Sequence, residues 1–224
     1  MEQLVLRDIP TADTEEAVFK SLRLPPDTDP EDLADARALV RGAAAVARPK
    51  AVLCLSQITE RGDGFVSVDG VRFDCALMAE NFRALHRVFP YVCTCGCELE
   101  AWSQTLADPL HAYWADCVKL FYVGAAQTFL FSTVRERYLP TGHLSHMNPG
   151  SLSQWPLPQQ RALFSILGDV EGAVGVTLTE SFLMVPAKST SGILFASETS
   201  YENCRLCPMP GCPNRRAPFT ENNA

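Results

Sequence analysis

The sequence lacks any cluster of basic residues. Its 19 lysines and arginines are spread over 224 residues, the formal net charge is -7, and the only adjacent basic pair is Arg215-Arg216. Proteins that bind nucleic acid by neutralising phosphates need grouped lysines and arginines. We therefore expect no nucleic acid partner.

Glycine-rich nucleotide motifs are also missing. The chain contains neither a Walker-type loop nor a G-x-G-x-x-G pattern, so a dinucleotide or phosphate-cradling domain is not indicated. Its four histidines are scattered, which argues against a histidine metal site.

A basic, apolar leader is not evident, because the chain starts Met1-Glu2-Gln3. The longest apolar stretch, residues 114–131, is interrupted by Asp116, Lys119 and Gln127, which is typical of a core helix and not of a membrane span. These features predict a cytoplasmic protein without a membrane partner.

The cysteine content does not suggest a disulfide framework, because nine is an odd number and the expected compartment is reducing. Three single cysteines have apolar neighbours and are expected in the core, namely Cys54, Cys75 and Cys117. The remaining six form two clusters, Cys93, Cys95 and Cys97, and Cys204, Cys207 and Cys212.

Helix and strand signals alternate irregularly, which predicts an α+β class and a single domain with a twisted, mainly antiparallel sheet. Helices are expected over residues 15–22, 29–48, 76–88, 98–106, 110–138 and 157–167. Strands are expected over residues 51–59, 65–68, 71–73, 91–94, 174–178, 182–185 and 193–195. The stripe expected to face the core on the long helix comprises Tyr113, Trp114, Cys117, Leu120, Phe121, Gly124 and Phe131.

The tail from residue 201 to 224 is predicted to bind a metal. Two residues separate Cys204 from Cys207 and four separate Cys207 from Cys212, a spacing that allows thiolates to converge. A proline follows two of these cysteines, which favours an iron–sulfur cluster, while zinc stays open as the alternative. Three thiolates leave one coordination position of the metal unfilled. Cys95, Cys93 or Cys97 could fill it, or it stays open to a ligand.

Four short motifs follow one another in the last third of the chain. They are His146-Met147-Asn148-Pro149-Gly150, Trp155-Pro156-Leu157, Leu178-Thr179-Glu180-Ser181 and Lys188-Ser189-Thr190-Ser191-Gly192. In this order the chain resembles the activation domain of cobalamin (vitamin B12)-dependent methionine synthase, in its stand-alone, single-domain type. The resemblance covers roughly residues 51–195 and assigns residues 1–200 to an activation-like domain ahead of the cysteine tail.

The resemblance implies a domain that binds S-adenosylmethionine and sits over the cobalamin of a partner. The cofactor-binding candidates that it indicates are His146, Asn148, Pro149, Gly150, Ser151, Thr179, Glu180, Ser189, Ser191 and Gly192. No residue is assigned a catalytic role, because the hard chemistry belongs to the cofactor.

The sequence departs from the family pattern at charged positions. Family members usually have an arginine before the Pro-Gly pair and a tyrosine after it, where this chain has His146 and Ser151. Gln127 stands where the long helix usually has an acid. Because the ligand's carboxylate, amine and sulfonium need opposite charges, these departures predict weak or absent binding of S-adenosylmethionine.

The function predicted from the resemblance is that of an accessory protein. It would dock on a corrinoid methyltransferase protein and support its reductive reactivation, within a methionine synthase-type system. Since this chain lacks an Asp-x-His-x-x-Gly cobalamin motif, the corrinoid would belong to the partner. The alternative is a non-catalytic module that binds cobalamin or a corrinoid protein and uses zinc to hold its tail.

Overall fold

The computed structural model describes residues 2–11, 15–198, 201–212 and 215–220. The helices are α1 (Glu15–Ser21), α2 (Pro30–Val46), α3 (Ala76–Asn81), α4 (Cys97–Ser103), α5 (Pro109–Tyr138), α6 (Gln160–Leu167) and α7 (Val170–Val174). Two short 3-10 helices are η1 (Leu157–Gln159) and η2 (Asn203–Arg205). The strands are β1 (Glu2–Leu6), β2 (Lys50–Gly62), β3 (Phe65–Val68), β4 (Val71–Asp74), β5 (Arg87–Thr94), β6 (His143–Met147), β7 (Thr177–Leu178), β8 (Met184–Val185) and β9 (Ser189–Ser197).

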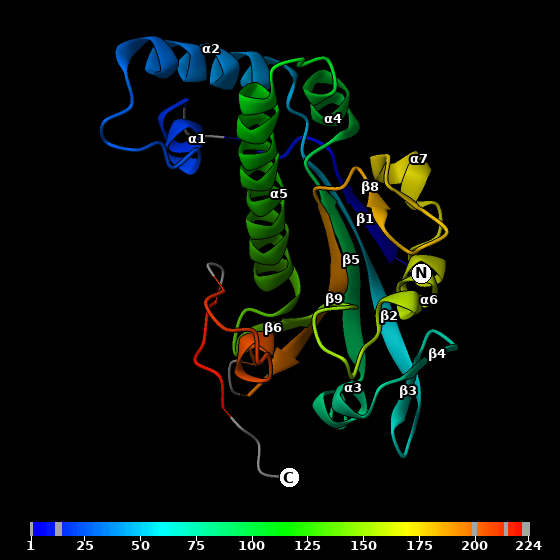
Figure 1. The fold of residues 1–224 in the computed structure, drawn as a ribbon. Coiled ribbons are helices and arrows are strands. Elements are labelled where there is room, and N and C mark those ends of the chain that lie inside the picture. The colour runs from blue at the N-terminus through cyan, green and yellow to red at the C-terminus, as the bar shows by residue number, and fades with distance from the viewer. Residues whose placement is uncertain (1, 12–14, 199–200, 213–214, 221–224) are drawn as a thin grey trace.

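Seven strands form one antiparallel sheet, as the fold class predicted. Its order is β4-β3-β2-β5-β9-β6, with β1 paired to β2. β7 and β8 form a separate two-stranded sheet. Figure 1 shows the sheet between two groups of helices, with α1, α2 and α5 on one side and α6 and α7 on the other.

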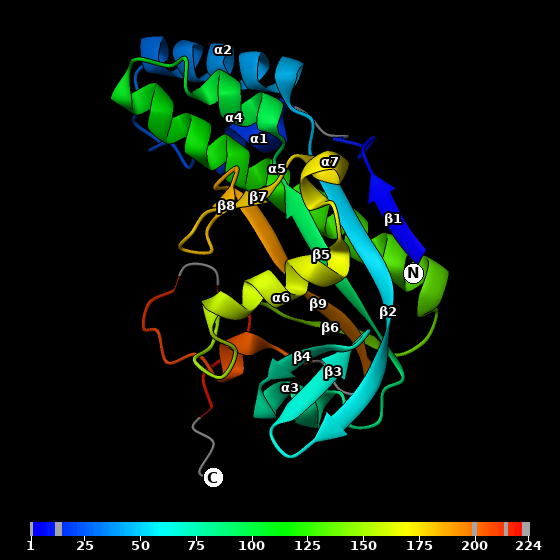
Figure 2. The same ribbon diagram turned by 90° about the vertical axis from the view of Figure 1, so that its right-hand side faces the viewer.

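Each face of the sheet carries its own hydrophobic core. On β2, Ala51 and Leu53 face the core shared with α2 and α5, while Val52 and Cys54 face the core shared with α6 and α7. This alternation follows from the two-residue repeat of a strand. The view in Figure 2 shows α6 lying across the second face, above β9 and β2.

Local sequence signals explain several element boundaries. The carboxylate of Asp29 accepts hydrogen bonds from the first backbone amides of α2, and Asp108 does the same for α5. A proline follows each of these caps, where the missing N–H costs nothing. The β3–β4 hairpin turns at Asp69 and Gly70, both with positive φ, as a type I′ turn requires.

Three predicted elements are wrong in type or extent. The helix expected over 76–88 stops at Asn81, and β5 already begins at Arg87. The segment 142–155, for which no helix or strand is expected, contains strand β6, and the strand expected over 174–178 is reduced to β7, because α7 ends at Val174. In each case pairing or packing with distant segments overrides the local pattern.

The buried face of α5 also differs from the predicted stripe. Trp114 is buried, but Tyr113 is 61% exposed and Leu120 is 54% exposed. Because apolar residues surround this helix, its periodicity does not identify the core face. By length and composition α5 is also apolar enough to cross a membrane, a test that core helices pass as well. Here α5 packs on the sheet and on α2.

The tail after β9 runs beside β6 (Figure 1). The backbone amide of Tyr201 donates to the Ser145 hydroxyl at 2.9 Å, and the Asn203 amide lies 3.5 Å from the Asn148 side-chain oxygen. The described part of the tail therefore contacts the same strand end that carries the first predicted motif.

Candidate functional site

A cavity of about 430 Å³ opens where the end of β6, the start of β9, α6 and the tail meet. Small-molecule sites commonly have volumes of about 300–1,000 Å³. The residues that line it are Gln127, His146, Asn148, Pro149, Ser151, Leu157, Gln160, Phe182, Leu183, Met184, Ala187, Ser189, Thr190, Ser191 and Arg216. We refer to this cavity as the groove.

The groove contains most of the predicted binding residues. Six of the ten candidates line it, namely His146, Asn148, Pro149, Ser151, Ser189 and Ser191. Gln127, which was expected to replace an acid, also lines it. The fold therefore brings these residues to one cavity, although His146 and Ser191 lie more than forty residues apart in the chain.

The base of the groove is a network around Tyr91. The Asn148 amide donates to the Tyr91 hydroxyl at 3.0 Å and to the backbone carbonyl of Ser191 at 2.8 Å. Burial raises the pKa of Tyr91 far above its usual range, against hydrogen bonds from Asn148 and Gln127. The phenol therefore stays neutral, and the network fixes the polar side chains that face the ligand.

A second buried network joins α6 to β9. The Ser191 hydroxyl donates to the Gln160 side-chain oxygen at 3.0 Å, and the Gln160 amide donates to the Phe182 carbonyl at 3.0 Å. Gln160 is almost fully buried and was not a predicted site residue. The sequence carried one signal for Gln160, because helical spacing places it on the same face as apolar residues of this short helix. A polar side chain on a buried face needs hydrogen-bond partners.

His146 is held in its neutral form. Burial and then the positive charge of Arg216 lower its pKa to about 4. The Arg216 Nη1 atom lies 3.4 Å from Nε2 of His146. Since a guanidinium only donates, Nε2 accepts and the imidazole proton is on Nδ1.

The glycines of the motifs shape the backbone rather than line the groove. Gly150 has a φ of +78° and donates its N–H to the Trp155 carbonyl at 2.8 Å, which closes the turn after Pro149. A β-carbon on Gly192 would collide with the Met147 carbonyl and the Asn148 amide. Both positions therefore need glycine for the shape of the surrounding loop and strand.

Thr179 and Glu180 do not line the groove. The Thr179 hydroxyl accepts from the Leu183 backbone amide at 3.1 Å and lies 3.0 Å from the Ser181 hydroxyl. Glu180 is exposed at the tip of the same turn. The hydrogen bonds of Thr179 close the turn between β7 and β8, and Phe182 and Leu183 of this turn line the groove.

Arg216 is the lining residue that changes the charge of the site. The sequence pattern predicted weak or absent binding of S-adenosylmethionine, because His146 stands near the usual arginine position. The tail brings a different cation, Arg216, to the groove, and the weak binding stays a prediction. No acidic residue is among the lining residues, so the described groove still lacks an acid near Gln127.

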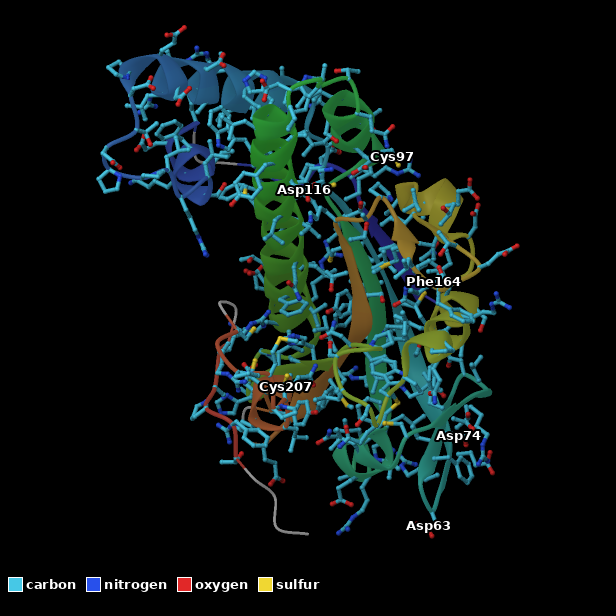
Figure 3. All side chains as sticks on the ribbon, viewed as in Figure 1. Asp63, Asp74, Cys97, Asp116, Phe164 and Cys207 are labelled. Carbon is cyan, nitrogen blue, oxygen red and sulfur yellow. The ribbon has the colours of Figure 1, made fainter. Side chains whose placement is uncertain are left out.

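The predicted metal ligands are not all close together. His146, which contacts the tail, and Phe89 of β5 both pair with the same residue of β9. Cys95 follows Phe89 by six residues, so it lies roughly 20 Å from the tail end of the sheet. Figure 3 shows Cys97 in the upper part of the molecule, well apart from Cys207 in the lower part. Cys95 is buried, and burial raises the pKa of its thiol to about 12.

Cys204, Cys207 and Cys212 are partly exposed in the tail loop. Within the described ranges, no three His, Cys, Asp or Glu side chains are grouped as a metal site requires. The fit of the described arrangement to a metal is therefore incomplete. The metal stays a prediction for these three cysteines, and the geometry does not support Cys95 as their fourth ligand.

Comparisons with known proteins give a family-model match and a likeness of fold. The family model described as "Vitamin B12 dependent methionine synthase, activation domain" matches residues 149–204. Among solved structures, the chain is similar to the MetH reactivation domain bound to AdoHcy, with a TM-score of 0.62 and 17% identity. The likeness covers 90% of this chain and 80% of that one, and at this identity it shows the fold. A search of curated proteins gave no match.

Proposed function

We propose that this chain, whose residues 149–204 match the activation-domain model of vitamin B12-dependent methionine synthase, docks on a corrinoid protein and supports its reductive reactivation. The groove would hold the S-adenosyl methyl donor during this step. The observation that carries the proposal is that most lining residues of the groove fall within the segment 149–204 that matches the family model.

The groove has the chemistry that an S-adenosyl ligand requires. Phe182, Leu183 and Met184 give one apolar wall, while hydroxyls of β9 and the side-chain amides of other lining residues give a polar one. Such a mixture orients a ligand with an apolar body and a few polar groups. The solved relative carries AdoHcy, which is the product form of the same methyl donor.

The corrinoid would supply the methyl-accepting cobalt and would come with the partner. The residues of this chain would bind and orient the methyl donor, and the neutral His146 and Tyr91 would add no competing charge beside it. We place this activity in the cytoplasm together with the methyltransferase partner.

The rim of the groove has an apolar surface suited to docking. Leu183 is 56% exposed at the groove, and Val185, two residues further along in β8, is 47% exposed. Exposed apolar residues beside a ligand site commonly mark an interaction surface. We propose that this rim contacts the corrinoid partner.

The test compares Leu183→Glu with the wild-type protein in a docking and reactivation assay. The variant should bind a purified corrinoid-binding domain at least about tenfold more weakly, because docking would desolvate the new charge. Reactivation, followed as loss of the cob(II)alamin absorbance with S-adenosylmethionine and a reductant, should fall in parallel.

Leu110→Glu is the matched control. Leu110 is 45% exposed near the start of α5, and Gln127 of the groove lies seventeen residues further along this helix, about 25 Å away. This variant should dock normally. Equal docking by all three proteins, or no docking by the wild type, would refute the proposed function. Docking without any cobalt reaction would favour a binding module.

A further inference from the structure

Among the described residues that line the groove, Arg216 is the one that carries a charge. It comes from the tail, beyond the segment that matches the family model. Within the described residues, the tail reaches the groove through Arg216, and Figure 1 shows the tail beside β6. A charge in this position can act on a bound ligand and can also depend on the state of the tail.

The guanidinium of Arg216 is not neutralised by a neighbouring acid. None of the ion pairs formed among the described residues includes Arg216. Its polar side-chain contact is the His146 ring, which is neutral. His146 therefore positions the guanidinium while leaving its full charge and most of its donors for another group.

The backbone around Arg216 is fixed by the cysteine loop. Its N–H donates to the Cys204 sulfur at 3.4 Å. The neighbouring Arg215 guanidinium donates to the carbonyls of Cys204 at 2.9 Å and Cys207 at 3.0 Å, and also to that of Met209. The position of Arg216 at the groove therefore depends on the folded loop that carries the tail cysteines.

We propose that Arg216 binds the carboxylate of an S-adenosyl amino acid in the groove, and that the cysteine tail holds it there. A guanidinium matches a carboxylate with two parallel N–H donors, a geometry that a neutral imidazole cannot provide. The tail would thus supply the cation that the segment before Pro149 lacks. This inference rests on the proposed function, because it assumes that the groove holds the S-adenosyl ligand.

The test uses two probes that differ in the amino-acid part. AdoHcy carries the carboxylate, whereas 5′-methylthioadenosine has the same adenosyl thioether without it. By calorimetry, Arg216→Ala should bind AdoHcy about tenfold or more weakly than the wild type, because a charge-assisted pair is lost. Its affinity for methylthioadenosine should stay unchanged, and Arg216→Lys should lose less affinity for AdoHcy.

Arg205→Ala is the control, since Arg205 is an exposed arginine of the same tail that does not line the groove. This variant should bind both probes like the wild type. The proposal is overturned if Arg216→Ala binds AdoHcy normally or loses both probes equally. Failure of the docking function would appear separately, as an unchanged corrinoid interaction of Leu183→Glu.

Discussion

Gly192 is the residue at which the geometry of the groove is most sensitive to one added carbon. It lies within β9, and a β-carbon there would come within 2.3 Å of the Met147 carbonyl oxygen and 2.8 Å of the Asn148 side-chain amide. We expect Gly192→Ala to lower the free energy of unfolding by about 1–3 kcal/mol, because overpacking pushes β6 away from β9. Chemical denaturation measures this change.

The control for this substitution is Gly124→Ala. Gly124 lies within α5, and a β-carbon there would meet no atom within 4 Å. Since alanine favours helix more than glycine, this variant should be more stable by up to about 1 kcal/mol. Equal stability of the two alanine variants would contradict the proposed close approach of β6 to Gly192.

At the residue scale, the motifs predicted the polar groups that neighbouring segments contribute to the groove. Asn148, Ser189 and Ser191 could be found in this way because each lies within a short family pattern. Arg216 could not, since its place depends on the tail crossing β6 and on a contact with His146 seventy residues away. Gly150 and Gly192 do not line the groove, and the structure gives them a role in the shape of the backbone.

At the element scale, capping and turn residues were sufficient where the structure is local. Asp29-Pro30, Asp108-Pro109 and Asp69-Gly70 each mark the boundary or turn that the structure has. β1 and β6 escaped prediction, because each is a five-residue strand stabilised by pairing with a distant partner. The face of α5 could not be assigned, because both of its sides are apolar.

Ion pairs join three elements at the end of the sheet opposite the tail. Lys119 of α5 is nearly buried and lies 3.1 Å from Glu100 of α4 and 3.0 Å from Asp116. Asp116 also lies 2.9 Å from Lys188, which precedes β9. The cluster therefore fixes the segment that leads into the groove residues of β9.

These contacts predict a pH-dependent contribution to stability. Burial acts to raise the pKa of Asp116, but hydrogen bonds and the charges of Lys188 and Lys119 outweigh it and hold this pKa below its usual value. A carboxyl whose pKa is lower in the folded state stabilises the fold above its unfolded pKa, near 4, and this contribution is lost as the pH falls.

Asp116→Asn should therefore lower the free energy of unfolding by about 0.5–1 kcal/mol at pH 7, since the carboxylate is half exposed. The difference from the wild type should shrink as the pH falls below about 4. Urea denaturation at several pH values measures it. The control is Asp63→Asn, which should show little change. Asp63 is exposed at the tip of a hairpin, and Figure 3 labels both it and Asp116. A difference for Asp116→Asn that is constant with pH would contradict this assignment.

At the scale of the whole molecule, the single α+β domain was predictable, but its relation to the tail was not. The sequence suggested a separate metal-binding unit that Cys95 might complete. The structure places the described tail against β6 and the groove, at the other end of β5 from Cys95. The spacing of cysteines along a chain does not reveal which end of a sheet they reach.

The tail metal is the prediction that joins this arrangement to function. The loop with the three tail cysteines has its backbone held by Arg215, whose guanidinium donates to the carbonyls of Cys204 and Cys207. Metal binding would therefore require the cysteine side chains to turn, with little change in the backbone. We expect anaerobically purified protein to contain metal, and Cys207→Ser to lose it, while Cys95→Ser and Cys117→Ser retain it. Metal analysis measures the content, and a visible band that bleaches on reduction separates an iron–sulfur cluster from colourless zinc.

Because Cys204 contacts the backbone of Arg216, loss of metal should also weaken AdoHcy binding, which calorimetry measures. Unchanged metal content in Cys207→Ser would exclude the tail site, and loss of metal in Cys95→Ser would show that the tail reaches the far end of β5.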